Sequence, residues 1–182
     1  MTQWIGGMGI IVLTIAILPL LGIGGMELFV AEAPGPTKDK IHPRIKETAK
    51  RLWIIYFSLT ALETVVLMSF GLSFFDAINH SLTTTSTGGF STKQESIAAF
   101  QNPFVEAVIV IFMFLAGTNF TMIYFGLKMK FRKIVNNDEF KWYLSAVLIL
   151  ILMLSFYRAH TSSSDFIHSF REISFQVVSI IT

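Results

Sequence analysis

The stretch SFFDAINHSLTTTSTGGF, residues 73–90, decides the fold. Its apolar residues at positions 74, 75, 78 and 82 have helical spacing, and Ser73 is of a residue type that caps helix N-termini. About 11 residues with a rise of ~1.5 Å each form a helix of ~16 Å, roughly half of a ~30 Å hydrocarbon core. A half-length helix over 73–84 followed by Ser86-Thr-Gly-Gly-Phe90 indicates a re-entrant loop, with a filter strand over 85–91.

Around this loop, four apolar segments are long enough to cross a bilayer, which takes ~20 residues. They cover about residues 4–29, 52–72, 104–127 and 140–157, the last being the shortest. The composition agrees, because only 14% of the 182 residues are charged, against about 25% in soluble domains. The sequence therefore predicts an all-α integral membrane protein in which spans alternate with re-entrant pore helices.

The basic residues are concentrated in two linkers. Eleven of the fourteen Lys and Arg residues lie in residues 38–51 and 128–141. Cytoplasmic loops carry the excess of positive charge in membrane proteins. We therefore expect both linkers in the cytoplasm, and residues 73–103 and 158–182 on the outer side of the membrane.

Residues 170–182 repeat the pattern of residues 74–85. Phe-Phe-Asp-Ala-Ile-Asn-His-Ser-Leu-Thr-Thr-Thr aligns with Phe-Arg-Glu-Ile-Ser-Phe-Gln-Val-Val-Ser-Ile-Ile-Thr, in pattern more than in identity. Ser164 precedes the second segment as its expected N-terminal cap. Self-similarity of this kind indicates an internal repeat of span, pore helix and span. The predicted units are the end of one repeat (1–29), a linker (30–51), a whole repeat (52–128), a second linker (129–139) and the start of another repeat (140–182).

The Thr-Gly-Gly sequence of the predicted filter strand suits ion coordination. Non-helical backbone is tolerated at membrane depth where it lines protein or water, and a K⁺ filter replaces the hydration shell of the ion with backbone carbonyls. Gly88 and Gly89 allow the chain to aim carbonyls at one axis, and Thr87 adds a hydroxyl or a carbonyl. The helix end near Thr84 carries about half a negative charge, which stabilises a cation. From spacing alone, an ordinary extracellular turn remains the alternative.

Five motifs carry a resemblance to a known family. They are Thr2-Gln-Trp-Ile-Gly-Gly-Met-Gly-Ile-Ile11, Ala31-Glu-Ala-Pro-Gly-Pro-Thr-Lys-Asp-Lys40, Glu47-Thr-Ala-Lys-Arg-Leu-Trp53, Phe75-Asp-Ala-Ile-Asn-His80 and Thr84-Thr-Ser-Thr-Gly-Gly-Phe-Ser-Thr92. The chain resembles, over essentially its whole length, the TrkH branch of the Trk/Ktr/HKT superfamily of potassium-uptake channels. The resemblance implies four membrane–pore–membrane repeats around one pore. It matches the filter strand of the second repeat to Ser86, Thr87, Gly88, Gly89 and Phe90, with K⁺ held at Thr87 and Gly88.

The resemblance also implies the context of this pore. Residues 174–182 match the pore helix of the third repeat, and a complete member is far longer, so we interpret the chain as a fragment of the pore subunit. Members form homodimers, dock a TrkA-like nucleotide-binding regulatory subunit in the cytoplasm, and cross the bacterial inner membrane several times. K⁺ is the transported ion, and no cofactor is expected. The net charge of only +2 and the lack of a basic, aromatic stripe argue against a nucleic-acid partner.

Two polar residues in the predicted spans keep other mechanisms open. Glu63 is either a coupling residue or a structural acid, since intramembrane acids are functional candidates. Asn119 either lines the inner cavity or bonds neighbouring helices. An ion-coupled (H⁺ or Na⁺) K⁺ symporter would use these two residues, and a non-transporting membrane subunit is a further alternative. The other acids and the histidines are scattered over both sides of the membrane, so we predict no enzyme.

Overall fold

The fold is seen in a computed structural model that describes residues 2–9, 45–162 and 165–182. The predictions for the first span beyond Gly9, for the linker before Ile45 and for a cap at Ser164 concern residues outside these ranges. The described elements are α1 (Thr2–Trp4), η1 (Ile5–Gly9), α4 (Ile45–Ser69), α5 (Phe74–Thr85), η3 (Ser96–Phe100), α6 (Pro103–Ala116), α7 (Phe120–Leu127), α8 (Phe131–Val135), α9 (Asp138–Ser162) and α10 (Phe166–Ile181). Every regular element in these ranges is a helix, which confirms the predicted fold class.

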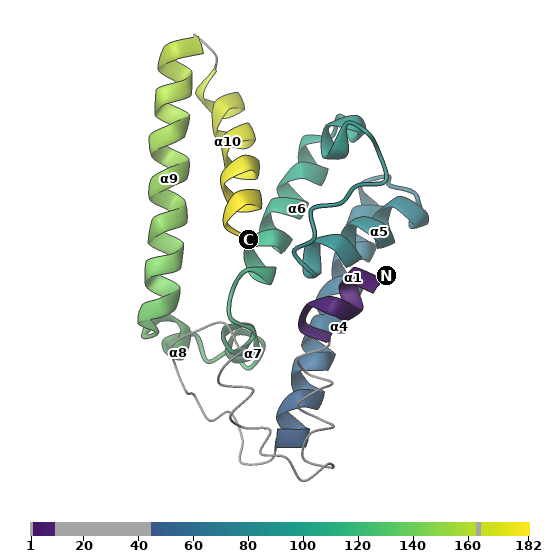
Figure 1. The fold of residues 1–182 in the computed structure, drawn as a ribbon. Helices are drawn as coiled ribbons and strands as arrows, with labels where there is room; N and C mark the ends of the chain where they lie inside the picture. Colours follow the sequence, from purple (N-terminus) through teal and green to yellow (C-terminus); the bar gives the residue numbers. More distant parts are fainter. Residues whose placement is uncertain (1, 10–44, 163–164) are drawn as a thin grey trace.

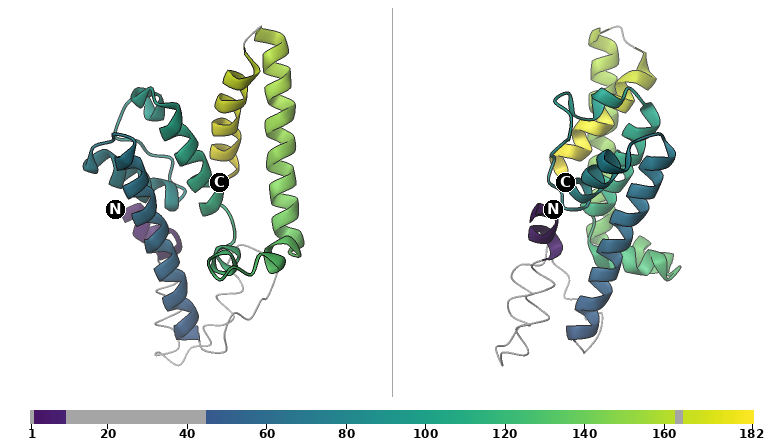
Figure 2. Two further views of the ribbon diagram at one scale, coloured as in Figure 1. Left: turned by 180° about the vertical axis from the view of Figure 1, so that it is seen from behind. Right: turned by 90° about the vertical axis from the view of Figure 1, so that its right-hand side faces the viewer.

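Two helical hairpins dominate the arrangement (Figure 1). In each hairpin a long helix, α4 or α9, is followed by a short helix, α5 or α10, that turns back along it. Helix α6 lies between the hairpins, as the two further views also show (Figure 2). The starts of α5 and α10 lie toward one end of the molecule, and α8 lies at the other end with the start of α4 (Figure 1). Two short helices, each following a long one, are the arrangement predicted from the repeat.

Two of the described helices are long and apolar enough to cross a membrane. They lie at Lys50–Ser69, within α4, and at Asp138–Thr161, within α9. Helix α4 ends three residues earlier than the predicted boundary at residue 72, because a glycine turn stops it. Gly71 has φ +94°, and the Leu72 amide donates to the Leu67 carbonyl at 3.3 Å, as in a Schellman motif. Helix α9 is longer than the predicted span 140–157.

The third predicted span, residues 104–127, is not one helix, and this prediction is wrong. Helix α6 ends at Ala116, and α7 begins only at Phe120. Gly117 caps α6, with its amide bonded to the Met113 carbonyl at 2.9 Å. The Thr118 hydroxyl donates to the Phe114 carbonyl at 2.8 Å, so a side chain takes over one of the last carbonyls of α6. The chain then leaves the helix axis before α7 (Figure 1).

Three apolar clusters hold these helices together. The first joins α4 and α7 through residues that include Tyr56 and Phe120, with Trp4 of α1 packed against it. The second joins α4, α5, η3 and α6 around Leu67, Ala77 and Val105. The third joins α9 and α10 and extends to α6. Helix α6 therefore packs against both hairpins and fixes α5 relative to α10.

Candidate functional site

The candidate site is the loop from Ser73 to Lys93, and its helix begins as predicted. Ser73 is the N-cap of α5, and its hydroxyl oxygen accepts the Asp76 amide at 3.1 Å. The same hydroxyl donates to Asp76 Oδ2 at 2.9 Å. Serine at the cap with an acid three positions later is the spacing of a capping box. The local sequence therefore fixes where the pore helix starts.

The helix ends by turning directly into the predicted filter strand. The Thr87 amide donates to the Thr84 carbonyl at 3.0 Å, and the Gly88 amide donates to the Thr83 carbonyl at 2.8 Å. The Ser86 hydroxyl bonds the Leu82 carbonyl at 2.7 Å. The last carbonyls of α5 are thus satisfied by the strand that follows. The C-terminal end of the helix, where the macrodipole is negative, lies at the start of this strand.

Thr87 and Gly89 share a left-handed backbone conformation, which Gly88 between them does not have. Gly89 has φ +70°, and Thr87 has φ +52° although it is β-branched. A β-branched residue in this region is an outlier that costs about 1–3 kcal/mol and is held by its surroundings. A methyl group on Gly88 would lie 2.4 Å from Gln3 Nε2, but this is the end of a flexible, exposed side chain that can move aside, so Gln3 alone does not require glycine here. The expectation that both glycines serve conformation therefore holds for Gly89, while Gly88 permits close approach.

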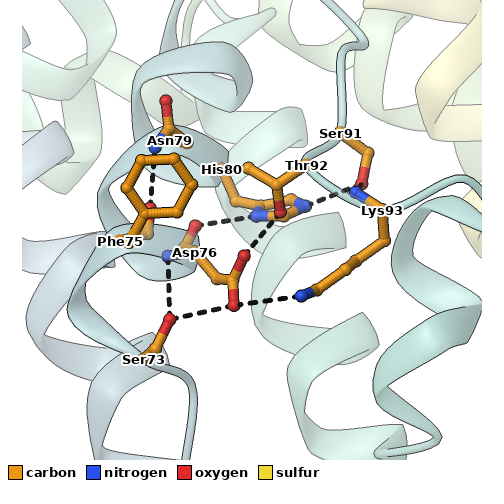
Figure 3. A network of polar contacts seen from close by, with 8 residues as sticks. All are labelled: Ser73, Phe75, Asp76, Asn79, His80, Ser91, Thr92 and Lys93. Carbon is orange, nitrogen blue, oxygen red and sulfur yellow. Dashed lines mark hydrogen bonds and ion pairs between the residues drawn. The ribbon is translucent and has the colours of Figure 1, made fainter.

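A polar network ties the outgoing strand back to the start of the helix (Figure 3). The Thr92 hydroxyl donates to Asp76 Oδ1 at 2.6 Å, and Lys93 Nζ lies 3.6 Å from Asp76 Oδ2. The pKa of Asp76 is lowered, first by the Thr92 hydrogen bond and then by the Ser73 hydrogen bond, with Lys93 adding a favourable charge. The carboxylate is therefore ionised and closes the loop on both sides of the predicted filter strand.

His80 makes a second tie between helix and strand (Figure 3). Its Nδ1 lies 2.7 Å from the Asp76 carbonyl oxygen, which can only accept, so Nδ1 carries a proton. Its Nε2 lies 3.1 Å from Ser91 Oγ. The Ser91 oxygen also accepts the Lys93 amide at 3.1 Å. The ring is buried, with 2% exposed, and thus acts as a scaffold behind the strand.

Glu63 lies outside this network, on the face of α4 that packs against α5. Its side chain is fully buried, and neither carboxylate oxygen has a hydrogen-bond partner among the residues that the structure describes. The Thr84 side chain in the last turn of α5 interacts with it, without hydrogen-bond geometry. The neighbouring Thr60 hydroxyl bonds Thr85 Oγ1 at 3.2 Å. Glu63 therefore sits behind the pore helix, in a hydroxyl-lined interface.

Asn119 lies in the break between α6 and α7. Its carbonyl accepts the Met122 amide at 2.8 Å at the start of α7, and the residue is half-buried. The structure thus separates the two polar candidates: Glu63 belongs to the α4–α5 interface, and Asn119 to a helix break in the next span.

Sequence reasoning missed Asp76 and Thr92. The signal for Asp76 was available, because Ser73 and Asp76 have capping-box spacing. Nothing local marks Thr92 as its partner, since the two residues are 16 positions apart and meet only when the loop folds back.

Comparisons with known proteins agree with this geometry. A family model described as "TrkH: Cation transport protein" matches residues 1–151. The chain belongs to the TrkH family. It is 44% identical over 188 residues to the Trk system potassium uptake protein TrkH of Escherichia coli (strain K12), covering 100% of this chain and 38% of that protein. It is 33% identical over 181 residues to the Trk system potassium uptake protein TrkI of Halomonas elongata, covering 99% of this chain and 36% of that one.

A solved structure shows the same fold. The crystal structure of the potassium transporter TrkH from Vibrio parahaemolyticus matches with a TM-score of 0.76 and 36% sequence identity, and covers 98% of this chain and 36% of that chain. The resemblance predicted from the motifs is confirmed. The chain is a membrane protein of a transporter family, and it spans little more than a third of the length of these relatives.

Proposed function

We propose that this chain is part of a potassium-uptake protein and supplies one filter strand, residues 86–90, to a pore lined by several repeats. The observation that carries the proposal is the loop itself. A half-length helix ends in a strand with Thr87 and Gly89 in left-handed backbone conformations, and both sides of that strand are fastened to α5. Family membership supports K⁺ as the ion, because the relatives are named potassium uptake proteins.

The chemistry of the strand fits a conducting site. Residues 85–91 contain no acid, so the carbonyls of Thr87 and Gly88 would contact the ion without a carboxylate that would trap it. Fast passage needs binding that is favourable but weak. The strained backbone at Thr87 is held by contacts outside the strand, which is how a filter keeps its carbonyls oriented when no ion is bound.

The proposal also covers the partner subunit, the oligomeric state and the membrane in which the protein lies. The relatives are components of a Trk system, which supports a regulatory subunit of the TrkA-like, nucleotide-binding kind at the cytoplasmic end. The exposed basic residues of 128–133 lie at the end where the start of α4 also lies (Figure 1). We further propose a homodimer in the bacterial inner membrane.

The test uses a chimera in which this chain replaces the matching segment of the Escherichia coli relative, expressed in a K⁺-uptake-deficient bacterium. We expect the chimera to take up Rb⁺ in preference to Na⁺. Gly88→Ser should abolish this preference, because a side chain beside the Thr87 and Gly88 carbonyls would crowd the proposed path of the ion. Gly126→Ser is the matched control, since its new group meets only Ile134 Cδ1 at 3.6 Å. Retained Rb⁺ preference in Gly88→Ser would overturn the filter assignment.

A second candidate is an ion-coupled symporter that uses Glu63, and the absence of a described partner for this buried carboxyl favours it. A buried, unpaired carboxylate is costly, so the group is neutral or binds a cation during transport. The Glu63→Gln variant separates the two candidates. Normal Rb⁺ uptake in that variant supports the channel, whereas lost uptake with an intact filter supports the symporter.

A further inference from the structure

The first filter residue of the second repeat lies against a glycine from the N-terminal segment. A methyl group on Gly7 would lie 3.4 Å from Ser86 Cβ and 3.1 Å from the Tyr56 hydroxyl oxygen. Three residues before this glycine, the Trp4 ring stacks on the Tyr56 ring at 5.0 Å and 23°. Gly7 itself has a non-helical ψ of −133°, so the segment is broken where the contact is made.

The end of α10 makes the same kind of contact. It again combines an aromatic ring, a glycine, a tyrosine and a helix C-cap residue, and these lie about 90 to 110 positions further along the chain than the first set. A methyl group on Gly117 would lie 2.6 Å from Thr182 Cγ2 and 2.8 Å from the Tyr143 hydroxyl oxygen. Three residues before this glycine, the Phe114 ring stacks on the Tyr143 ring at 5.0 Å and 20°. Gly117 again marks a break, between α6 and α7.

The two contacts are equivalent by position as well as by geometry. Ser86 is the C-cap of α5 and Thr182 is the C-cap of α10, and the two residues correspond in the alignment of the two pore helices. Tyr56 belongs to α4 and Tyr143 to α9, the long helices of the two hairpins. Each contact therefore joins the second span of one repeat to the first span and pore-helix end of the next.

We propose that these contacts are one repeated joint that positions the start of each filter strand relative to the preceding repeat. The first joint is Trp4, Gly7, Tyr56 and Ser86, and the second joint is Phe114, Gly117, Tyr143 and Thr182. The inference rests on the proposed function, and adds positioning residues to it. Stacked rings set the distance between the two long helices, and the glycine leaves room for the C-cap residue. A side chain at the glycine would strike the tyrosine and the C-cap residue, and we expect the start of the filter strand to shift as a result.

The geometry of the joints is tested first, without any transport measurement. The chain contains no cysteine, so cysteine pairs can be placed in a cysteine-free chimera. The pairs Gly7→Cys/Ser86→Cys and Gly117→Cys/Thr182→Cys have Cβ separations of 3.4 and 3.2 Å, close to the about 3.5–4.5 Å of disulfides. Both should cross-link on mild oxidation. The control pair Gly6→Cys/Ser86→Cys should not, because a Cβ on Gly6 meets nothing within 4 Å. Missing cross-links at either joint would overturn the inference.

The positioning role is tested by ion preference in the membrane-inserted chimera. Gly117→Ala should lower the Rb⁺/Na⁺ uptake ratio by about tenfold, which corresponds to a loss of about 1.4 kcal/mol in the free-energy difference between the two ions. Gly7→Ala should lower the ratio less. Gly6→Ala and Gly126→Ala should leave it unchanged.

Rescue separates positioning from damage to the fold. Tyr143→Phe and Thr182→Ser remove the two atoms that the Gly117→Ala methyl would strike, so the triple variant should recover most of the ratio. An unchanged ratio in Gly117→Ala would contradict the inference. So would a lower ratio that the added Tyr143→Phe and Thr182→Ser substitutions do not restore. If the parent chimera shows no Rb⁺ preference while the disulfides form, the proposed function fails and the joint geometry stands.

Discussion

The two hairpins have the same shape but different interfaces. Between α4 and α5, the buried residues are largely polar: Thr60, Glu63, Thr64, Ser81, Thr84 and Thr85. Between α9 and α10, an apolar cluster of Val147, Ile151, Ile173, Val177 and Val178 takes their place, with Ser155 and Ser169 as buried polar residues. The α4–α5 interface is therefore rich in buried hydroxyls, with the Thr60–Thr85 hydrogen bond across it and an apolar cluster beside it, whereas the α9–α10 interface is mainly apolar.

The two aligned acids also differ in their partners. Asp76 and Glu172 correspond in the alignment of α5 and α10. Asp76 is 9% exposed and bonds the strand after its own pore helix through Thr92. Glu172 pairs with Arg158 at the end of α9, and its side chain is 33% exposed. The acid closes a loop in one repeat and joins two helices in the other.

The largest expected effect breaks the apolar interface. Ile173→Asp places a carboxylate in the α9–α10 cluster, where no described cation compensates it, and should destabilise the protein by about 3–5 kcal/mol. Thermal unfolding of the purified chimera in detergent measures this. Ile173→Val, which removes one methylene, should cost only about 0.5–1.5 kcal/mol. A stable Ile173→Asp chimera would show that α10 does not depend on this interface.

The second-largest effect is the difference in stability lost when Asp76 or Glu172 is removed. Asp76→Ala removes the acceptor of the Thr92 and Ser73 hydroxyls and should cost about 1.5–3 kcal/mol, the range for hydrogen bonds to charged groups. Glu172→Ala removes a partly exposed ion pair and should cost less than about 1 kcal/mol. The same unfolding measurement applies. Equal losses would mean that the Asp76 network adds nothing beyond a surface charge.

A smaller effect is the pH dependence that Asp76 contributes. Its pKa in the folded protein is lowered by Thr92 and Ser73, so the unfolded chain binds its proton more readily. The stabilisation is complete above the ordinary value of about 3.9 and is lost as the pH falls through the lower folded pKa. Unfolding temperatures at falling pH should drop more steeply for the parent than for Asp76→Asn. Parallel curves would contradict the assignment.

The smallest expected effect is the difference in stability lost when the hydroxyl of Tyr56 or of Tyr143 is removed. The Tyr56 hydroxyl donates to the Trp4 carbonyl at 3.0 Å, whereas the Tyr143 hydroxyl is buried without a partner among the described residues. The Phe114 carbonyl, which holds the place of the Trp4 carbonyl, already accepts from Thr118. Tyr56→Phe should therefore cost about 1 kcal/mol and Tyr143→Phe close to none. Equal costs would remove this distinction.

Local signals explain what the sequence predicted. The cap at Ser73, the half-length helix after it and the helical pattern of residues 170–182 depend on neighbours in the chain, and the structure has these elements. The assignment of residues 86–90 as a filter strand, and the roles of Glu63 and Asn119, stay predictions.

The remaining features depend on distant partners. The break falls at Gly117-Thr118-Asn119, a loop-type tripeptide inside an otherwise apolar run whose total length favoured a single span. The residue that Gly117 approaches, Thr182, is far along the chain. The close approach of Gly88 to Gln3 also depends on a residue 85 positions away, which local reasoning could not predict. The joints likewise assemble residues from three separate helices, which no short motif records.

The central claim is that carbonyls of residues 86–90 line the path of the ion. Anomalous diffraction from crystals of the chimera grown in Rb⁺ tests it most directly. We expect an anomalous peak in contact with the Thr87 and Gly88 carbonyl oxygens, and its loss in Gly88→Ser. Rb⁺ peaks that lie elsewhere, with none against this strand, would contradict it.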